Sequence, residues 1–312
     1  MSILVVGSVA YDDVETAAER RSDVLGGAAS YFSVAAAKYA PVRLCGVVGD
    51  DFRAADRARI AAAGVDLAGL ERRPGRTFRW LGRYDETFGA ADTINTDLGV
   101  FASWRPVVPL AYLDSELLFL ANIDPDIQLA VRGQLPASRF VALDTMNYWI
   151  GQKRDTLLQV VANVDLVCLN EGEIRQLCET PNVIAAARTL LGRGPAAVVV
   201  KRAEHGATLF TADGIFWCPA YPVERVVDPT GAGDSFAGGL VGSLAAAERI
   251  DGAALRRAVV EGSVCASFTV ESFGIDRLQA ASATELGQRR AALKAIVDVA
   301  GTGVPFALYE GR

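Results

Sequence analysis

The chain has 312 residues, a formal net charge of −6 and a hydrophobic fraction of 51%. This composition supplies a large core, fits one α/β unit and argues against a long disordered region. The negative charge argues against nucleic acid or an anionic membrane as the main partner, whereas a nucleotide can still bind through backbone amides.

Cysteine and histidine usage narrows the chemistry further. The five cysteines are scattered and form no CxxC pair, which predicts buried thiols in a reducing compartment. His205 is the only histidine, so a His-based zinc site or a Ser-His-Asp triad is not expected. Met1 leads directly into an apolar strand, and no apolar run is long enough to span a bilayer. We therefore expect a cytoplasmic protein.

Short apolar runs alternate with helical patterns along the chain. This alternation predicts βαβ units, which build a mostly parallel sheet covered by helices on both faces. Ligands of such sheets bind beyond the carboxyl ends of the strands. The predicted strands are residues 3–6, 42–48, 117–120, 140–143, 166–169 and 197–200, and the predicted helices are residues 28–39, 52–63, 154–161 and 183–191.

Residues 73–104 interrupt this alternation. β-prone and aromatic residues such as Phe78, Trp80 and Tyr84 are separated there by charged residues and glycines. The pattern predicts a small antiparallel insertion, with an ordinary surface hairpin as the alternative. No linker or internal repeat divides the rest, so residues 1–312 are predicted to form one domain.

A run of small residues, Gly231, Ala232 and Gly233, precedes Asp234 and a predicted helix over residues 235–247. Small residues let the backbone approach a ligand closely, and the first amides of a helix favour an anion. The motif can therefore hold developing charge on a phosphoryl group, while Asp234 can take a proton from an attacking hydroxyl. A capping Asp in a Gly-rich turn is the alternative.

The whole segment from Asp228 to Gly239 resembles the C-terminal signature of the ribokinase-like (PfkB) family of carbohydrate kinases. The resemblance extends over nearly the whole chain. It implies a ribokinase-like three-layer α/β/α fold with a mostly parallel central sheet and a small β lid, built mainly from about 73–104 with a contribution from about 9–24.

The same resemblance implies roles for the residues of this signature. Gly231, Ala232 and Gly233 would form the anion hole, and Asp234 would be the catalytic base. Two further residues, Asp228 and Thr230, would lie near a monovalent-cation site, and Thr230, Gly231 and Gly233 would also contact the nucleotide. A GxxxxGK[ST] loop is absent, as expected for the family.

On the acceptor side, the resemblance implies that Asp12 binds substrate hydroxyls and that Gly26-Gly27 forms a substrate loop. A carboxylate can accept two hydrogen bonds from a diol. Asp13 competes for the role, and a turn-forming Asp is the alternative. Tyr31 stands where many sugar kinases of the family have Asn, and it is expected in the same pocket. This departure bears on sugar specificity and leaves the kinase chemistry intact.

On the nucleotide side, Asn170 and Glu173 resemble the NxxE motif, which orders Mg²⁺ through water. A helix cap is the alternative. The segment from Lys201 to Gly206 resembles the nucleotide loop, with Ala203 in place of a usual Gly. Residues 266–274 resemble the segment that lines the adenine pocket and the cation site.

The expected activity is transfer of the γ-phosphoryl group of ATP to a hydroxyl of a small polar metabolite, with Mg²⁺ required and K⁺ as an open question. A sugar is the first expectation for the acceptor. A nucleoside is the second, because Tyr31, Phe78, Trp80 and Phe88 could stack on a base or form the lid core. An inositol-like polyol is a further alternative.

Two alternatives of other classes remain at this point: a ligand-sensing module without catalysis, and a Rossmann dehydrogenase, for which no GxGxxG follows a predicted strand. A homodimer through the lid is left open, since a lid edge can pair between subunits.

Overall fold

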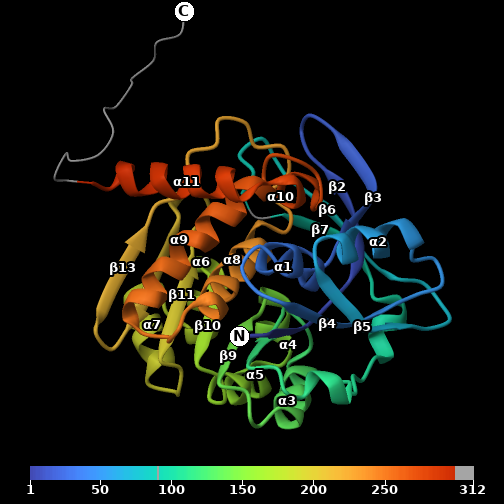
Figure 1. Cartoon of the computed structure of the whole chain (residues 1–312), viewed down its shortest axis with the longest axis horizontal. Coiled ribbons are helices and arrows are strands. Elements are labelled where there is room, and N and C mark those ends of the chain that lie inside the picture. Colours follow the sequence, from blue (N-terminus) through green and yellow to red (C-terminus); the bar gives the residue numbers. More distant parts are fainter. Residues whose placement is uncertain (90, 299–312) are drawn as a thin grey trace, which may run out of the picture.

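A nine-stranded sheet forms the centre of the computed structural model, which describes residues 1–89 and 91–298 (Figure 1). All neighbours from β11 to β5 are parallel, as predicted, while β12 and β13 add an antiparallel edge. In spatial order, the strands are β13 (Gly214–Cys218), β12 (Ala207–Thr211), β11 (Ala197–Lys201), β10 (Leu166–Asn170), β9 (Phe140–Asp144), β8 (Leu117–Leu120), β1 (Ile3–Val6), β4 (Val42–Val48) and β5 (Val65–Arg72).

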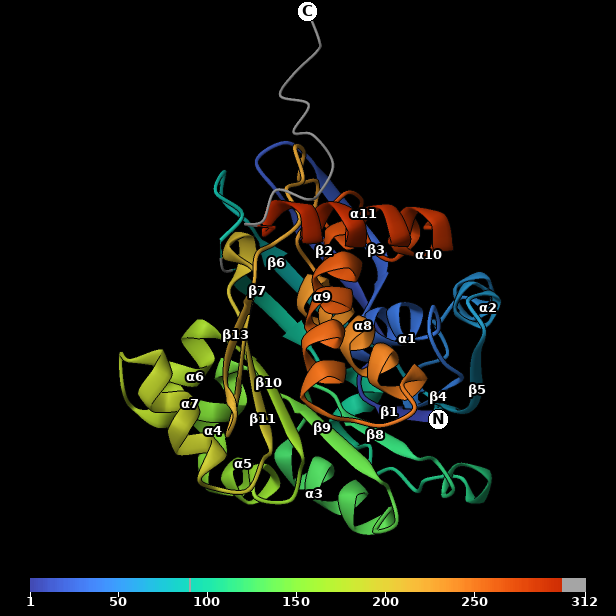
Figure 2. The same cartoon turned by 60° about the vertical axis from the view of Figure 1, so that its left-hand side comes forward.

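Each face of this sheet packs against its own set of helices, which makes three layers (Figure 2). In β1, Ile3 and Val5 enter one core, whereas Leu4 and Val6 enter the other, because successive side chains of a strand point to opposite faces. The first core is covered by α1 (Ala28–Ala36), α2 (Ala54–Ala62), α8 (Ala232–Ala246), α9 (Gly252–Thr269), α10 (Asp276–Ala280) and α11 (Ala283–Ile296), and the second by α3 (Pro125–Gln134), α4 (Asn147–Gln152), α5 (Arg154–Val161), α6 (Glu171–Cys178) and α7 (Val183–Leu191).

A second sheet of four strands follows the order β3-β2-β6-β7 within the described residues. Its members are β2 (Ala10–Glu15), β3 (Arg20–Gly26), β6 (Phe78–Arg83) and β7 (Asp92–Asp97). The segment predicted as an antiparallel insertion supplies β6 and β7, which are antiparallel. The sequence did not predict that β6 also pairs in parallel with β2.

Several predicted boundaries shift in the structure. The helix predicted over residues 28–39 ends at Ala36, and the one predicted over residues 52–63 spans Ala54–Ala62. The helix predicted from residue 235 begins three residues earlier, at Ala232. Asp234 therefore belongs to the first turn of α8. The tail from about residue 301, in which no motif was found, lies outside the described residues.

Among the helices that the structure describes, none combines the length and the apolar character needed to cross a membrane.

The contact between α1 and α8 depends on glycines that leave no room for a side chain. A Cβ built on Gly238 would lie 2.7 Å from the Cβ of Ala35 and would overlap the carbonyl oxygen of Phe32. Gly287 on α11 has nothing within 4 Å of a built Cβ.

We expect Gly238→Ala to lower the free energy of unfolding by about 1–3 kcal/mol, because the two helices must move apart. The matched control Gly287→Ala should raise it by roughly 0.5–1 kcal/mol, since alanine is the better helix former. Urea unfolding of both variants checks this pair, and equal effects would contradict the close packing of α1 on α8.

Candidate active site

Charged side chains gather where three adjacent parallel strands end. Asp144, Asn170 and Lys201 are the last residues of β9, β10 and β11. Asn170 pairs with Lys201 in register. The first turn of α8 reaches the same edge, since a Cβ built on Gly233 would lie 3.3 Å from Lys201 Nζ. The predicted site residues of β10, β11 and α8 thus meet at the carboxyl edge of the sheet.

The start of α8 offers unpaired backbone amides. Gly231 is the N-cap residue with a φ of 76°, and a Cβ there would overlap the ring of Tyr31, so only glycine fits. The Ala232 amide donates to the Pro229 carbonyl at 3.1 Å. In the described part of the chain, the amides of Gly233 and Asp234 have no partner, and no side chain caps the helix. This helix end can receive an anion.

Asp234 projects from that first turn. Burial raises the pKa of its carboxyl to about 7, Asp144 raises it as well, and Lys201 lowers it. A carboxyl group with this pKa is available as a proton acceptor near neutral pH.

Asp12 lies on β2 with its carboxylate against the Gly26-Gly27 loop. A Cβ built on Gly26 would overlap that carboxylate, and the Gly27 amide hydrogen-bonds to it. Burial, followed by the charges of Asp228 and Asp234, raises the pKa of Asp12 well above its usual range. Asp13 accepts the amide of Asp23 at 2.8 Å on the exposed side of the hairpin. The structure therefore groups Asp12 with the Gly-Gly loop and Asp234.

Two phenol groups lie beside these carboxyl groups. The Tyr31 side chain is fully buried, and its hydroxyl has no hydrogen-bond partner among the described residues. Burial, then the charges of Asp12, Asp228 and Asp234, raise the pKa of Tyr31. The second phenol belongs to Tyr84, which was not among the predicted site residues because no motif marks it.

Tyr84 follows β6 and is also buried. The Thr230 hydroxyl donates to the Tyr84 hydroxyl at 3.2 Å. The four-stranded sheet is thereby connected to the loop that precedes α8.

The Asp228 carboxyl is 0% exposed. Its Oδ1 accepts the Thr230 amide at 2.9 Å, whereas its Oδ2 is buried without a partner among the described residues. Burial raises the pKa of Asp228 to about 6, and a bond from the Gly274 amide lowers it. The Asp228 amide bonds to the Val270 carbonyl, so residues 270–274 adjoin this carboxyl. An unpaired buried carboxylate oxygen suits a cation.

Asn170 and Glu173 form a capping box at the start of α6. Asn170 Oδ1 accepts the Glu173 amide at 2.8 Å, and Glu173 Oε2 accepts the Asn170 amide at 2.7 Å. The helix-cap alternative is therefore realised, and it uses one oxygen of each side chain. Burial raises the pKa of Glu173 to about 7, with Lys201 acting in the opposite direction.

Lys201 does not stand alone at the end of β11. Its Nζ donates to Asp144 Oδ2 at 2.6 Å. Asp144 was not among the predicted site residues, although the sequence carries a signal for it. A polar residue directly follows each of three predicted strands: Asp144 follows residues 140–143, Asn170 follows residues 166–169 and Lys201 follows residues 197–200. Gly206 lies beside the end of β11, where its carbonyl accepts the Arg202 amide at 2.8 Å and a built Cβ would overlap the backbone of Cys218 and Pro219.

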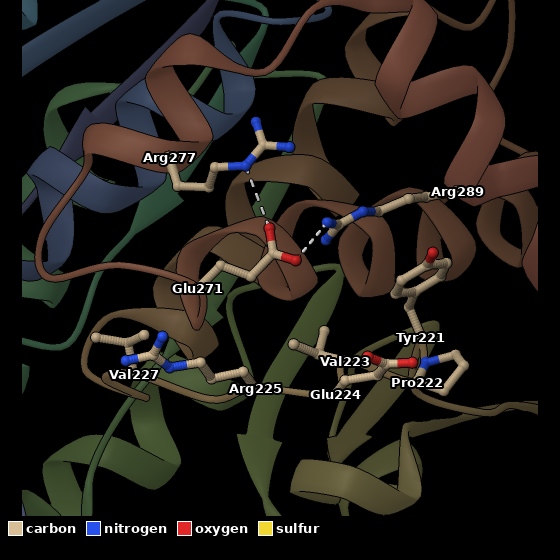
Figure 3. Close-up of a pocket in the computed structure, with 9 residues that line it drawn as sticks. All are labelled: Tyr221, Pro222, Val223, Glu224, Arg225, Val227, Glu271, Arg277 and Arg289. Carbon is tan, nitrogen blue, oxygen red and sulfur yellow. Dashed lines mark hydrogen bonds and ion pairs between the residues drawn. The ribbon is translucent and has the colours of Figure 1, made fainter. Parts of the chain in front are cut away.

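A hollow on the described surface lies beside this site, next to Asp228. It measures about 620 Å³ and is lined by the loop at residues 221–227 and by Glu271, Arg277 and Arg289. Glu271 lies between the two arginines and pairs with both (Figure 3). Glu271 belongs to the segment 266–274, which was predicted to line the adenine pocket, whereas Asp12, Tyr31 and Asp228 do not line the hollow and are buried. These three side chains are therefore shielded from solvent in this structure.

Comparison with known proteins agrees with this geometry. Residues 2–280 match the family described as "pfkB family carbohydrate kinase". A cytidine kinase of Thermococcus kodakarensis is 32% identical over 249 residues, which cover 77% of this chain and 87% of that protein. A nucleoside kinase of Methanocaldococcus jannaschii is 25% identical over 161 residues, or 52% of this chain and 51% of that protein.

Solved structures show the same fold. The crystal structure of the M. jannaschii nucleoside kinase, described as an archaeal member of the ribokinase family, superposes with a TM-score of 0.76 at 20% identity, covering 93% of this chain and 98% of that one. A putative ribokinase II from E. coli gives a TM-score of 0.78 at 21% identity over 93% and 99% of the two chains. The predicted ribokinase-like α/β fold is confirmed. The chain belongs to the pfkB family of carbohydrate kinases and is a phosphotransferase that acts on a hydroxyl acceptor.

Proposed function

We propose that the protein is an ATP-dependent nucleoside kinase that phosphorylates a ribose hydroxyl. The observation that carries this choice is the 32% identity to a cytidine kinase over most of both chains. The sequence alone ranked a free sugar ahead of a nucleoside. Both kinds of acceptor present neighbouring hydroxyls to Asp12, so the residues that would contact a base are what distinguish a nucleoside kinase from a sugar kinase.

Trp80 supplies a surface for a base. It pairs with Asp12 across the parallel strands β2 and β6, so both side chains leave the same face of the four-stranded sheet. The indole lies over Gly82, where a Cβ would overlap it, and its Nε1 donates to Thr93 at 3.2 Å. Phe78 instead stacks on Phe101, which belongs to the second core of the nine-stranded sheet. A nucleoside whose ribose reaches Asp12 would have its base near Trp80.

The acceptor side is proposed to consist of Asp12, Tyr31 and the Gly26-Gly27 backbone. The unpaired Tyr31 hydroxyl and the Asp12 carboxylate can both bond to ribose hydroxyls. Access requires the four-stranded sheet to move, so we propose that it acts as a lid on a single kinase domain.

The chemistry is proposed to centre on Asp234. Its carboxylate takes the proton of the attacking hydroxyl as the new O–P bond forms, and the bond from the γ-phosphorus to the β–γ bridging oxygen breaks, so that ADP leaves. The amides at the start of α8, with Gly231, Ala232 and Gly233, stabilise the transferred charge.

The nucleotide side is proposed to consist of Lys201, the loop ending at Gly206, Thr230 and the Gly231–Gly233 turn. Asn170 and Glu173 would hold Mg²⁺ through water, and the ion would neutralise phosphate charge. The unpaired Oδ2 of Asp228 supports a monovalent cation such as K⁺ at Asp228 and Thr230.

The edge of β7 also supports a proposal. β7 pairs only with β6 in the described sheet, so its outer edge is available for a homodimer through the lid. A cytoplasmic location completes the proposal.

A panel of nucleosides, free sugars and polyols, assayed for ADP release with ATP and Mg²⁺, tests the acceptor class. Cytidine or another nucleoside should give the highest kcat/KM. A free sugar that exceeds every nucleoside would restore the sugar assignment.

Asp234→Asn is expected to lower kcat by roughly 100- to 10,000-fold, the usual contribution of a general base. In the wild type, kcat/KM should rise with pH up to about 7, as Asp234 loses its proton, and then level off. The raised pKa means that ionised Asp234 destabilises the fold, so Asp234→Asn should melt no earlier than the wild type at pH 8. Activity within a few-fold of wild type would contradict the assignment.

Glu173→Gln is expected to raise the Mg²⁺ concentration needed for half-maximal activity. Glutamine can keep the capping box, so the melting temperature should hold. A Mg²⁺ titration at saturating ATP measures the effect. An unchanged titration curve would show that Glu173 caps the helix and has no role in Mg²⁺ binding.

Asp12→Ala is expected to lower acceptor kcat/KM by roughly one to four powers of ten, for one or two charged hydrogen bonds. Tyr31→Phe should lower it by roughly 2- to 10-fold, for one neutral bond, without loss of stability, because the hydroxyl has no partner to lose. ATP affinity should stay unchanged in both. Early melting with normal acceptor kinetics would show that these residues serve the fold only.

A further inference from the structure

A buried ion pair lies on the nucleotide side of the site. Lys201 Nζ is 2.6 Å from Asp144 Oδ2, and the two side chains are 16% and 3% exposed. β9 and β11 flank β10, so the pair spans β10 at the carboxyl edge of the sheet. The Thr145 amide donates to Asp144 Oδ1 at 2.8 Å. Both carboxylate oxygens are therefore held, one by the backbone and one by the lysine.

The lysine ammonium lies against the first turn of α8. A Cβ on Gly233 would be 3.3 Å from Lys201 Nζ and 3.8 Å from Cδ and Cε. Glycine at this position leaves space beside the ammonium, and the unpaired amides of Gly233 and Asp234 border that space. The Lys201 ammonium and these amides are hydrogen-bond donors, and the ammonium charge adds to the partial positive charge of the helix N-terminus.

We propose that Lys201 contacts the phosphoryl group during its transfer and that Asp144 is the positioning residue that holds Lys201 at the start of α8. This inference rests on the proposed kinase function. An ammonium has three donors, and Asp144 takes one. The other two remain for phosphoryl oxygens. Because the pair is formed before the nucleotide binds, the lysine needs little reorganisation when charge develops.

The surroundings favour this role over a structural one. Glu173 from α6 and Cys168 from β10 also face Lys201, and Asp234 from α8 faces both members of the pair. Burial alone would lower the pKa of Lys201, but Asp144, Cys168 and Glu173 raise it above its usual value, so the ammonium stays charged. The charge of Asp234 also raises the pKa of Asp12, Tyr31 and Tyr84, so Asp234 lies close to the proposed acceptor-side groups as well.

Lys201→Met is expected to lower kcat about 100-fold or more, the usual effect of removing one donor to a developing oxyanion. Asp144→Asn should lower kcat less, with little change in acceptor KM. The acid limb of the pH profile of kcat/KM should move in opposite directions in these two variants. Asp144 raises the pKa of Asp234, so Asp144→Asn moves the limb to lower pH; Lys201 lowers it, so Lys201→Met moves the limb to higher pH. A purely structural pair would move the limbs in the same way but leave kcat above the limb near the wild-type value, so kcat is the readout that decides between the two roles.

The double variant Asp144→Asn/Lys201→Met separates folding from chemistry. It leaves no unpaired buried charge, so it should melt later than either single variant. Its kcat should stay as low as that of Lys201→Met. A double variant that regains wild-type kcat would overturn the proposal. Lys38→Met is the matched control. Among the described residues, this lysine bonds to the carbonyls of Gln279 and Ala281, at 2.8 and 2.7 Å, and its loss should not change kcat.

Nucleotide affinity gives a readout that needs no acceptor. Lys201→Met should weaken MgATP binding more than MgADP binding, because the contact is with the transferred group. Equal weakening of both, with kcat unchanged, would contradict the role of Lys201. If the wild type binds MgATP but phosphorylates no nucleoside, the proposed acceptor class is wrong. The ratio of the MgATP affinity to the MgADP affinity in Lys201→Met, compared with that of the wild type, still tests the role of Lys201.

Discussion

Carboxyl groups buried at the start of α8 are the constraint on which the rest of the site depends. Asp12, Asp228 and Asp234 come from separate parts of the chain, and burial raises the pKa of each. Their ionised forms lack the donors that a buried carboxylate needs, as the unpaired Oδ2 of Asp228 shows. The proposed ligands supply what is missing: a cation, ribose hydroxyls and the proton of the attacking hydroxyl.

The same burial makes the site unfavourable for folding. All three pKa values lie above those of the unfolded chain, so the free energy of unfolding falls as pH rises from about 4 towards 7. Strain of this kind is common where charge must be available for chemistry. The large double core on the two faces of the nine-stranded sheet offsets it.

Asp234 joins two groups of side chains that the fold brings to one edge. Asp12, Tyr31 and Tyr84 form one group, which we propose binds the acceptor, and Asp144 and Lys201 form the other, which we propose binds the nucleotide. The position of α8 produces this arrangement, because its first turn touches both the Tyr31 ring and the Lys201 ammonium. The two substrates are therefore expected to meet at one carboxylate.

The sequence predicted the parallel sheet well, because apolar runs such as residues 117–120 are buried on both faces and leave a continuous hydrophobic signal. It placed the residues from Gly231 to Asp234 at a helix start because that motif is local, although the helix begins at Ala232 rather than at residue 235. Tyr84 and the parallel pairing of β2 with β6 were missed, since both depend on contacts between residues far apart in the chain. Asp144 was missed for a different reason: Asn170 and Lys201 belong to motifs of the family, whereas no motif marked Asp144.

Transfer of label from [γ-³²P]ATP to cytidine in a single turnover, followed over pH 5 to 9 for the wild type and Asp234→Asn, tests the central claim most directly. The account predicts that labelled nucleoside monophosphate forms with a rate that rises up to about pH 7 in the wild type, and that the rate in the variant is far slower and lacks this rise. Rapid labelling by Asp234→Asn with the same pH profile as the wild type would contradict it.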